Sequence, residues 1–267
     1  MVELKSWVGA DLGKRVVSYD EQDVILYALA VGARAGDLEL VFERDLRVLP
    51  TFGLTLGLWA ADAASAAGAY VPAAALHGSQ ELTVRSSLPP AATFETFGSI
   101  AGLWDTGRSA ILDVVAECEY FSARYSIFLP GQGGFGGEKP PKAHAGHGST
   151  EVDRTSTFHV GAEQAALYRL TGDRHAIHID PVAAEAAGFD RPILHGLCTL
   201  GIAAREIAGV VGAAPWELRT IGARFAAPVR PGSDLVVAAS EVAGDGSVSF
   251  QASVGEERVL SAGYAGF

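Results

Sequence analysis

Hydrophobic and polar positions alternate in two runs of short segments, one in each half of the chain. Val, Thr and aromatic residues mark these segments, and turns rich in Pro, Gly and Asp separate them, which is typical of antiparallel strands. Ahead of each run, apolar residues recur at helical spacing, which predicts a short helix followed by a longer one. The expected strands are 79–88, 92–102, 109–119, 121–129, 218–229, 234–243, 247–254 and 258–266. The expected helices are 21–34, 51–67, 162–171 and 196–211.

The repeated order of elements comes with short sequence matches between the two halves. Residues 26–29 (LYAL) match 167–170 (LYRL) at an offset of 141, and residues 55–58 (TLGL) match 199–202 (TLGI) at an offset of 144. Self-similarity at a nearly constant offset indicates a duplicated unit. The predicted domains are a first repeat at 1–129, a Gly- and Pro-rich linker at 130–152 and a second repeat at 153–267.

The helix expected from Gly196 is apolar on nearly every side. Leu197, Leu200 and Ile207 lie on one face, and Ile202 extends the apolar surface around the helix. Such a helix must be enclosed by the protein. A strongly curved antiparallel sheet wrapped around it provides that enclosure. The predicted fold is therefore α+β, a double hot-dog with two curved antiparallel sheets, each wrapping a long central helix.

Composition limits the classes of function. The 267 residues carry a formal net charge of -11, which argues against nucleic-acid binding because that needs a basic surface. An anionic ligand held by a local group of arginines stays possible. Cys118 and Cys198 are too few for a disulfide framework, and no metal-binding motif is present, so no metal is expected. Without a signal peptide or an apolar stretch that could span a bilayer, we expect a soluble cytoplasmic protein with no membrane partner.

A carboxylate and an imidazole stand five positions apart, at Asp173 and His178. A loop can bring both groups to one water molecule, and an imidazole readily exchanges a proton near neutral pH. Taken alone, such a pair is more often a stabilising contact. Gly196 favours catalysis, because a helix leaves its first N–H groups unpaired and glycine lets a ligand carbonyl approach closely. A donor in that place would stabilise a thioester enolate.

The first repeat lacks this pair. At an offset of 141, Gly32 corresponds to Asp173, and Asp37 corresponds to His178. One catalytic half and one silent half are therefore expected.

Several segments resemble the MaoC-like, type 2 (R-specific) enoyl-CoA hydratases. In the second half they are residues 163–173, the His178-Ile179-Asp180-Pro181 step and residues 188–198. In the first half they are residues 19–21, 49–53, 76–78 and, beyond it, 133–137. The resemblance covers most of the chain and is closest to double-hot-dog members, including the hydratase region of peroxisomal multifunctional enzymes.

The resemblance implies both an activity and a site. The family motif Asp-x-Asn-Pro-x-His falls on residues 173–178, which makes Asp173 and His178 the catalytic pair, and the oxyanion donor falls on the N–H of Gly196. The pair would activate a water that adds syn across a trans-2-enoyl-CoA and gives a 3(R)-hydroxyacyl-CoA, a step of fatty acid β-oxidation. An acyl-CoA thioester is then the substrate, no cofactor is needed beyond the coenzyme A that it carries, and a homodimer is possible.

The sequence departs from the motif at two positions. His175 stands at the Asn of the motif and Ala176 at its Pro. We expect activity to survive, with His175 taking over the supporting role of the amide and His195 helping to orient the substrate. Three further residues are candidates for coenzyme A phosphate contacts: Arg191, Arg224 and Arg230.

Other sequence features do not indicate a functional site, and other functions are compatible with the same residues. Residues 131–136 spell G-x-G-x-x-G, but prolines follow where a dinucleotide site needs a helix. We interpret His77 as structural, Cys198 as a packing residue, and His144 and His147 as linker residues. The alternatives are a dehydratase of 3-hydroxyacyl thioesters in a biosynthetic pathway, a hot-dog thioesterase, and a non-catalytic acyl-CoA-binding or scaffold partner.

Overall fold

The computed structural model describes residues 4–141 and 154–267. Ten antiparallel strands form one sheet in the order β1-β3-β4-β5-β2-β7-β10-β9-β8-β6. The strands of the first half are β1 (Asp11–Tyr19), β2 (Leu76–Val84), β3 (Ala92–Asp105), β4 (Ala110–Glu117) and β5 (Phe121–Leu129). Those of the second half are β6 (Arg154–His159), β7 (Thr220–Phe225), β8 (Asp234–Ala239), β9 (Ser247–Val254) and β10 (Glu257–Gly266).

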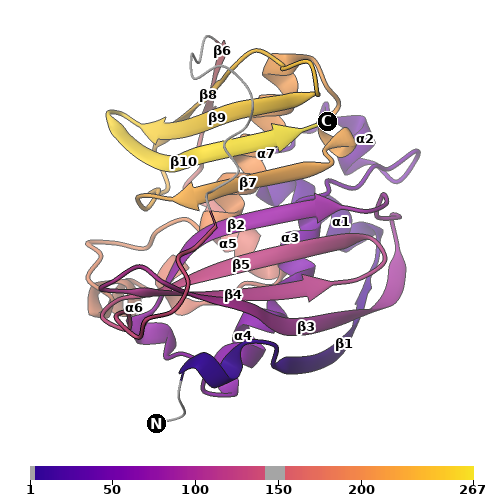
Figure 1. Ribbon diagram of the computed structural model, residues 1–267. Helices are drawn as coiled ribbons and strands as arrows, with labels where there is room; N and C mark the ends of the chain where they lie inside the picture. The colour runs from indigo at the N-terminus through magenta and orange to yellow at the C-terminus, as the bar shows by residue number, and fades with distance from the viewer. Residues whose placement is uncertain (1–3, 142–153) are drawn as a thin grey trace.

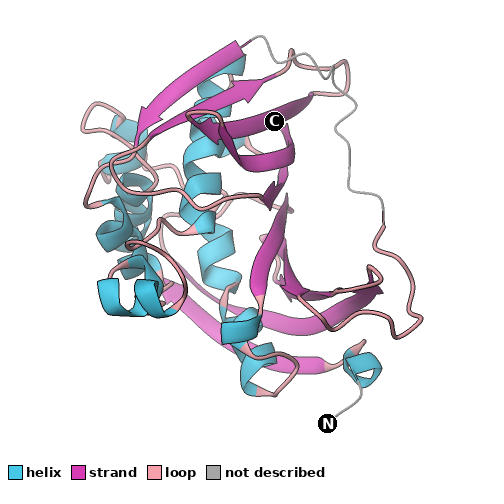
Figure 2. Ribbon diagram, turned by 90° about the vertical axis from the view of Figure 1, so that its left-hand side faces the viewer, coloured by secondary structure: helices cyan, strands magenta, loops and turns pink. Residues whose placement is uncertain are grey.

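The helices gather on one side of this curved sheet (Figure 2). In the first half they are α1 (Glu21–Ala30), α2 (Leu38–Val41), α3 (Phe52–Gly57) and α4 (Trp59–Ala66). In the second half they are α5 (Gln164–Tyr168), α6 (Pro181–Ala186) and α7 (Gly196–Val211). None of the helices in the described part of the chain is long and apolar enough to cross a membrane.

The two halves of the sheet meet edge to edge through β2 and β7 (Figure 1). The paired residues run from Ser79 opposite Arg224 to Thr83 opposite Thr220. Five strands lie on each side of this junction, and each half carries its own helices, as the double hot-dog fold requires. The junction places α3 and α7 within contact of each other, so residues of both halves can face one space.

The helix α7 has the predicted bounds and is the enclosed helix of the second half. Ten of its residues are buried, and it ends at Gly212, whose φ of 75° gives the left-handed cap typical of glycine. Gly201 lets α7 approach α1 closely, since a Cβ there would lie 2.7 Å from the Val31 side chain. This contact joins the helices of the two halves.

The corresponding helix of the first half is shorter than predicted. Instead of one helix over 51–67, α3 and α4 meet at Leu58. The hydroxyl of Tyr125 donates to the carbonyl of Leu54 at 2.5 Å, and the N–H of Leu58 turns to the carbonyl of Thr55. A side chain from the sheet thus occupies the acceptor that a regular helix would use at this turn.

Two strands were not predicted, β1 and β6. Both lie at the edges of the sheet, and only two residues of β1 and one of β6 are buried. Edge strands carry polar side chains that hide the apolar alternation of a strand. The helix expected at 162–171 is also shorter, because α5 ends at Tyr168 and a 3₁₀ turn follows at Arg169–Thr171.

The described part of the expected linker, residues 130–141, forms a loop that holds a carboxylate. The backbone N–H groups of Gly107, Gly134 and Gly136 donate to Asp105 at 2.8 to 2.9 Å, and these bonds lower the pKa of Asp105. The G-x-G-x-x-G segment is therefore part of a structural loop, and no helix follows it within residues 137–141. His144 and His147 lie outside the described residues.

Candidate active site

The Asp173 loop, residues 172–178, follows the 3₁₀ turn Arg169–Thr171, includes a second one at Ala176–His178 and lies against α3. Gly172 has a φ of 148°, and a Cβ there would lie 2.9 Å from the methyl group of Thr55. The N–H of His175 donates to Oδ1 of Asp173 at 3.2 Å, and the N–H of Ile177 donates to Nδ1 of His175 at 3.4 Å. These contacts hold the short connection between the two 3₁₀ turns, and they fix the direction of the Asp173 carboxylate.

The loop brings three titratable side chains together. Asp173, His178 and His195 each offer one oxygen or nitrogen atom, and these atoms lie within 4.8 Å of one another. The sequence pattern predicted the first two as a pair. His195, which precedes the first residue of α7, completes the group.

The tautomer of His178 follows from its partner. Its Nδ1 lies 2.9 Å from the carbonyl oxygen of Ile193, and a carbonyl can only accept. Nδ1 therefore carries the proton and donates it, which leaves Nε2 with a free lone pair. This is the form that a general base needs.

Burial keeps both imidazoles of the group neutral. His178 is 8% exposed, and burial lowers its pKa although the Asp173 charge acts in the opposite direction. His195 is fully buried, and burial together with the neighbouring His178 lowers its pKa to about 3. Because Nε2 of His195 donates to the backbone carbonyl of Asp173 at 3.1 Å, His195 ties the start of α7 to the loop.

The two rings are stacked, which bears on metal binding. Their centroids are 3.7 Å apart and their planes differ by 27°. The lone pairs of an imidazole lie in the ring plane, so stacked rings direct them side by side and away from a common point. A metal ion needs ligand atoms that converge. The arrangement suits proton transfer better than metal binding.

Gly196 begins α7 beside this group. None of the described residues accepts a hydrogen bond from its N–H, which lies at the positive end of the helix. A Cβ at this position would stand 3.0 Å from the ring of Phe225. Any larger residue would crowd the space from which a ligand carbonyl could approach.

His77 of β2 belongs to the surroundings of the site, which the sequence did not predict. Its ring packs edge-on against Phe225 at 4.8 Å, and it bonds to the Gln80 side chain at 3.0 Å. Burial lowers the pKa of His77 to about 4, and the nearby Asp173 charge acts in the opposite direction. The tripeptide Leu-His-Gly occurs at 76–78 and again at 194–196, and this identity was the available signal.

The remaining candidate residues, three arginines and Cys198, do not belong to the group of Asp173, His178 and His195. Arg230 is paired with Asp190, whose Oδ1 lies 3.0 Å from Nε and 2.8 Å from Nη2. Arg191 and Arg224 are exposed and have no ion-pair partner among the described residues. Cys198 is buried, donates to the carbonyl of Ala30 and has a raised pKa, which agrees with a packing role.

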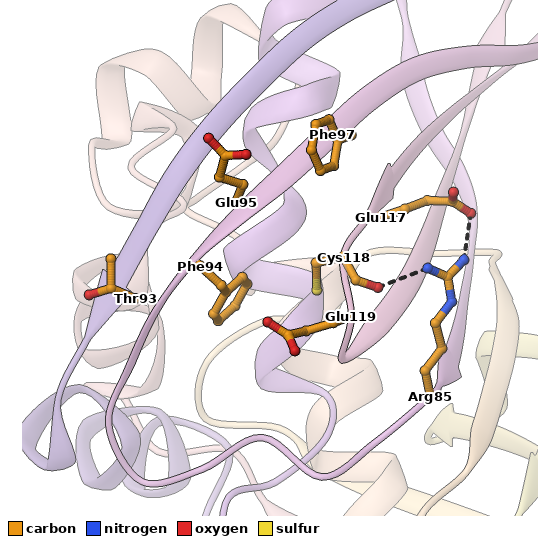
Figure 3. Close-up of a pocket in the computed structure, with 8 residues that line it drawn as sticks. All are labelled: Arg85, Thr93, Phe94, Glu95, Phe97, Glu117, Cys118 and Glu119. Carbon is orange, nitrogen blue, oxygen red and sulfur yellow. Dashed lines mark hydrogen bonds and ion pairs between the residues drawn. The ribbon is translucent and has the colours of Figure 1, made fainter.

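A separate surface pocket lies beside β3 and the β4–β5 turn (Figure 3). Arg85 bonds there to the Glu117 carboxylate at 3.0 Å and to the carbonyl of Cys118 at 2.8 Å. Burial raises the pKa of Cys118. None of the residues that line the pocket belongs to the Asp173 group, and the thiol is not activated.

Comparison with known families and proteins gives consistent results. A model of the "MaoC like domain" matches residues 142–264, and a model of the "MFE-2 hydratase 2 N-terminal domain" matches residues 17–128. The chain is 36% identical to 3-hydroxyacyl-thioester dehydratase Y of Mycobacterium tuberculosis, over 85% of this chain and 84% of that protein. It is 35% identical to the peroxisomal enoyl-CoA hydratase 2 of Arabidopsis thaliana, over 82% of this chain and 81% of that protein.

Among solved structures, a MaoC-like dehydratase from Phytophthora capsici superposes with a TM-score of 0.89. The match covers 100% of this chain and 98% of that one, at 24% identity. It supports the fold.

Proposed function

The chain belongs to the MaoC-like hydratase and dehydratase family, and we propose that it catalyses the reversible syn addition of water to trans-2-enoyl-CoA, which gives 3(R)-hydroxyacyl-CoA. The observation that carries this proposal is the state of His178. Its Nδ1–H is engaged by Ile193, so its Nε2 lone pair is free beside the Asp173 carboxylate. A hydro-lyase needs this combination of a neutral base and a second proton-handling group.

The proposed reaction assigns each step to a residue. His178 takes a proton from water, and the water oxygen forms a bond to C3 of the substrate. The π electrons of the double bond move through C2 to the thioester oxygen, where the N–H of Gly196 stabilises the enolate. The enolate then reforms the thioester carbonyl as C2 takes up the proton that His178 removed from water, and Asp173, which orients the water, helps to deliver that proton. Water supplies every atom that is added, so the reaction needs no redox cofactor.

The first half is proposed to be silent in catalysis and to accommodate the acyl group. Asp37, the counterpart of His178, donates no base to the site, because its carboxylate accepts from the N–H of Arg34 at 2.8 Å and pairs with Arg205 at 3.4 Å. Gly32, the counterpart of Asp173, is covered by the Phe158 ring. These contacts support a silent first half, and the division into 1–129, 130–152 and 153–267 stays a prediction.

The first experiment mixes the purified protein with crotonyl-CoA and, separately, a long-chain trans-2-enoyl-CoA. Loss of the conjugated thioester absorbance is followed, and chiral chromatography identifies the product. We expect turnover to a 3(R) product, and none in Asp173→Ala or His178→Ala. Release of free coenzyme A thiol would instead indicate a thioesterase. Binding without turnover would indicate the non-catalytic partner.

A second candidate is the reverse reaction, dehydration of 3-hydroxyacyl thioesters in a biosynthetic pathway. It is favoured by the similarity to a protein named as a 3-hydroxyacyl-thioester dehydratase, and it uses the same residues in reverse. Coenzyme A contacts by Arg191, Arg224 and Arg230, a homodimer and a cytoplasmic location stay predictions.

The pH dependence should report His178. Because burial lowers the pKa of His178, the neutral base persists below the ordinary imidazole value of about 6.5. We expect kcat/KM to be level above that value and to fall as the pH drops through the lowered pKa. His195, with a pKa of about 3, stays neutral throughout this range.

The measurement is kcat/KM for crotonyl-CoA between acidic and neutral pH, with circular dichroism at each pH to show that the protein stays folded. An acid limb centred above the ordinary imidazole value would contradict the assignment.

His175→Asn should change the rate little. The His175 side chain accepts a long hydrogen bond from the N–H of Ile177 and lies edge-on to the His178 ring at 6.1 Å, while its backbone N–H makes the bond to Asp173. An Asn side chain also accepts from a neighbouring backbone N–H, so we expect kcat/KM within about threefold of the wild type. An unchanged rate and pH profile would exclude a specific role for the imidazole, whereas a change above tenfold would require one.

A further inference from the structure

Asp62 lies on the helix face that is turned toward the Asp173 loop. Leu58 keeps a right-handed helical conformation, with φ −58° and ψ −28°, so the helical periodicity continues from α3 into α4. Thr55 and Asp62 are seven residues apart, which is two helical turns, and they share one face about 10.5 Å apart along the axis. The Thr55 methyl lies against Gly172, and its hydroxyl is 3.1 Å from that of Tyr168.

The charges of the Asp173 loop act on the Asp62 carboxyl group. Burial raises the pKa of Asp62, and the nearby Asp173 charge raises it further, while Arg15 and His175 act in the opposite direction. Two residues of the Asp173 loop, Asp173 and His175, therefore influence the pKa of Asp62. Arg15 belongs to β1, the edge strand of the first half of the sheet.

The Asp62 carboxylate has no partner of its own. No described residue lies within hydrogen-bond or ion-pair distance of it. The nearby Tyr70 hydroxyl donates to the carbonyl of Ala61 at 2.8 Å. Asp62 keeps contact with solvent, so water satisfies it until a ligand displaces that water.

We propose that Asp62 selects the acyl group, by accepting a hydrogen bond from a hydroxyl on the substrate chain and by disfavouring a plain alkyl chain of the same length. This inference rests on the proposed function and on the first half as the acyl-binding half. An alkyl chain against a carboxylate removes water without replacing its hydrogen bonds, which costs free energy. A hydroxyl replaces them, and a hydrogen bond to a charged acceptor is worth about tenfold or more in affinity.

The test compares matched substrate pairs that differ only by a terminal hydroxyl. The pairs are trans-2-hexenoyl-CoA with its 6-hydroxy form, and trans-2-octenoyl-CoA with its 8-hydroxy form. We expect the wild type to prefer the hydroxylated member of at least one pair by about tenfold in kcat/KM. Asp62→Leu should reverse this preference, and Asp62→Asn should keep part of it because an amide oxygen still accepts.

Two controls separate this effect from a general one. Glu257→Leu removes the same charge from an exposed position at the start of β10 and should keep the wild-type preference. Crotonyl-CoA, whose chain ends one carbon after the double bond, should be hydrated by Asp62→Leu within about threefold of the wild-type rate. If kcat/KM were the same for both members of each pair, in the wild type and in Asp62→Leu alike, the proposal would be overturned.

A failure of the proposed function gives a different result. If the wild type hydrates no enoyl-CoA, the reaction is wrong, and calorimetric binding of hexanoyl-CoA and 6-hydroxyhexanoyl-CoA then decides the role of Asp62. A preference for the hydroxylated thioester that Asp62→Leu loses supports the role. Equal dissociation constants for the two thioesters refute it.

Discussion

Asp173→Asn should lower kcat/KM for enoyl-CoA hydration by about a thousandfold while the protein stays folded. The amide keeps the shape of the carboxylate and the oxygen that accepts from the N–H of His175. His195 bonds to the backbone carbonyl of residue 173, so that contact also survives. What is lost is the negative charge and the ability to carry a proton to C2, and both are needed only in the reaction.

The measurement combines the absorbance assay with a thermal unfolding curve. Asp180→Asn is the matched control, because Asp180 lies in the same segment and caps α6 by accepting from the N–H of Val182 at 2.9 Å. Asn is as good a cap as Asp, so this variant should retain nearly full activity. A rate for Asp173→Asn within tenfold of the wild type would remove Asp173 from the mechanism.

The local part of the site could be predicted from sequence. Asp173 and His178 are close along the chain, so a short loop suffices to bring them together, and the all-round apolar pattern after Gly196 gave the bounds of α7. The state of His178 could not be predicted. It depends on the Ile193 carbonyl and on stacking with His195, which are contacts across the fold.

The same distinction holds for the fold. Strands with buried residues at alternate positions were found, whereas the polar edge strands β1 and β6 were not. The change of hydrogen bonding at Leu58 arises because the Tyr125 hydroxyl reaches the carbonyl of Leu54 from the sheet, and local helix propensity cannot predict a bond from a distant strand. The place of His77 next to Phe225 likewise depends on the pairing of β2 with β7.

His178→Gln should lower kcat/KM by at least about a hundredfold, and it should also change how the remaining rate depends on pH. Glutamine can still donate to the Ile193 carbonyl, as Nδ1 of His178 does at 2.9 Å, so the local backbone keeps a partner. It has no lone-pair nitrogen to accept a proton from water. Its replacement also removes the stacked partner of His195, which is too weakly basic to take over, with a pKa of about 3.

The acid limb makes this prediction specific. If His178 is the base, the limb seen in the wild type should disappear from the residual rate of His178→Gln, because no other imidazole of the group titrates in that range. His159→Gln is the control: it removes an exposed imidazole that pairs with Asp234 at 2.7 Å, and it should leave both rate and limb unchanged. A residual rate that keeps the wild-type limb would show that another group is the base, even if the rate itself had fallen.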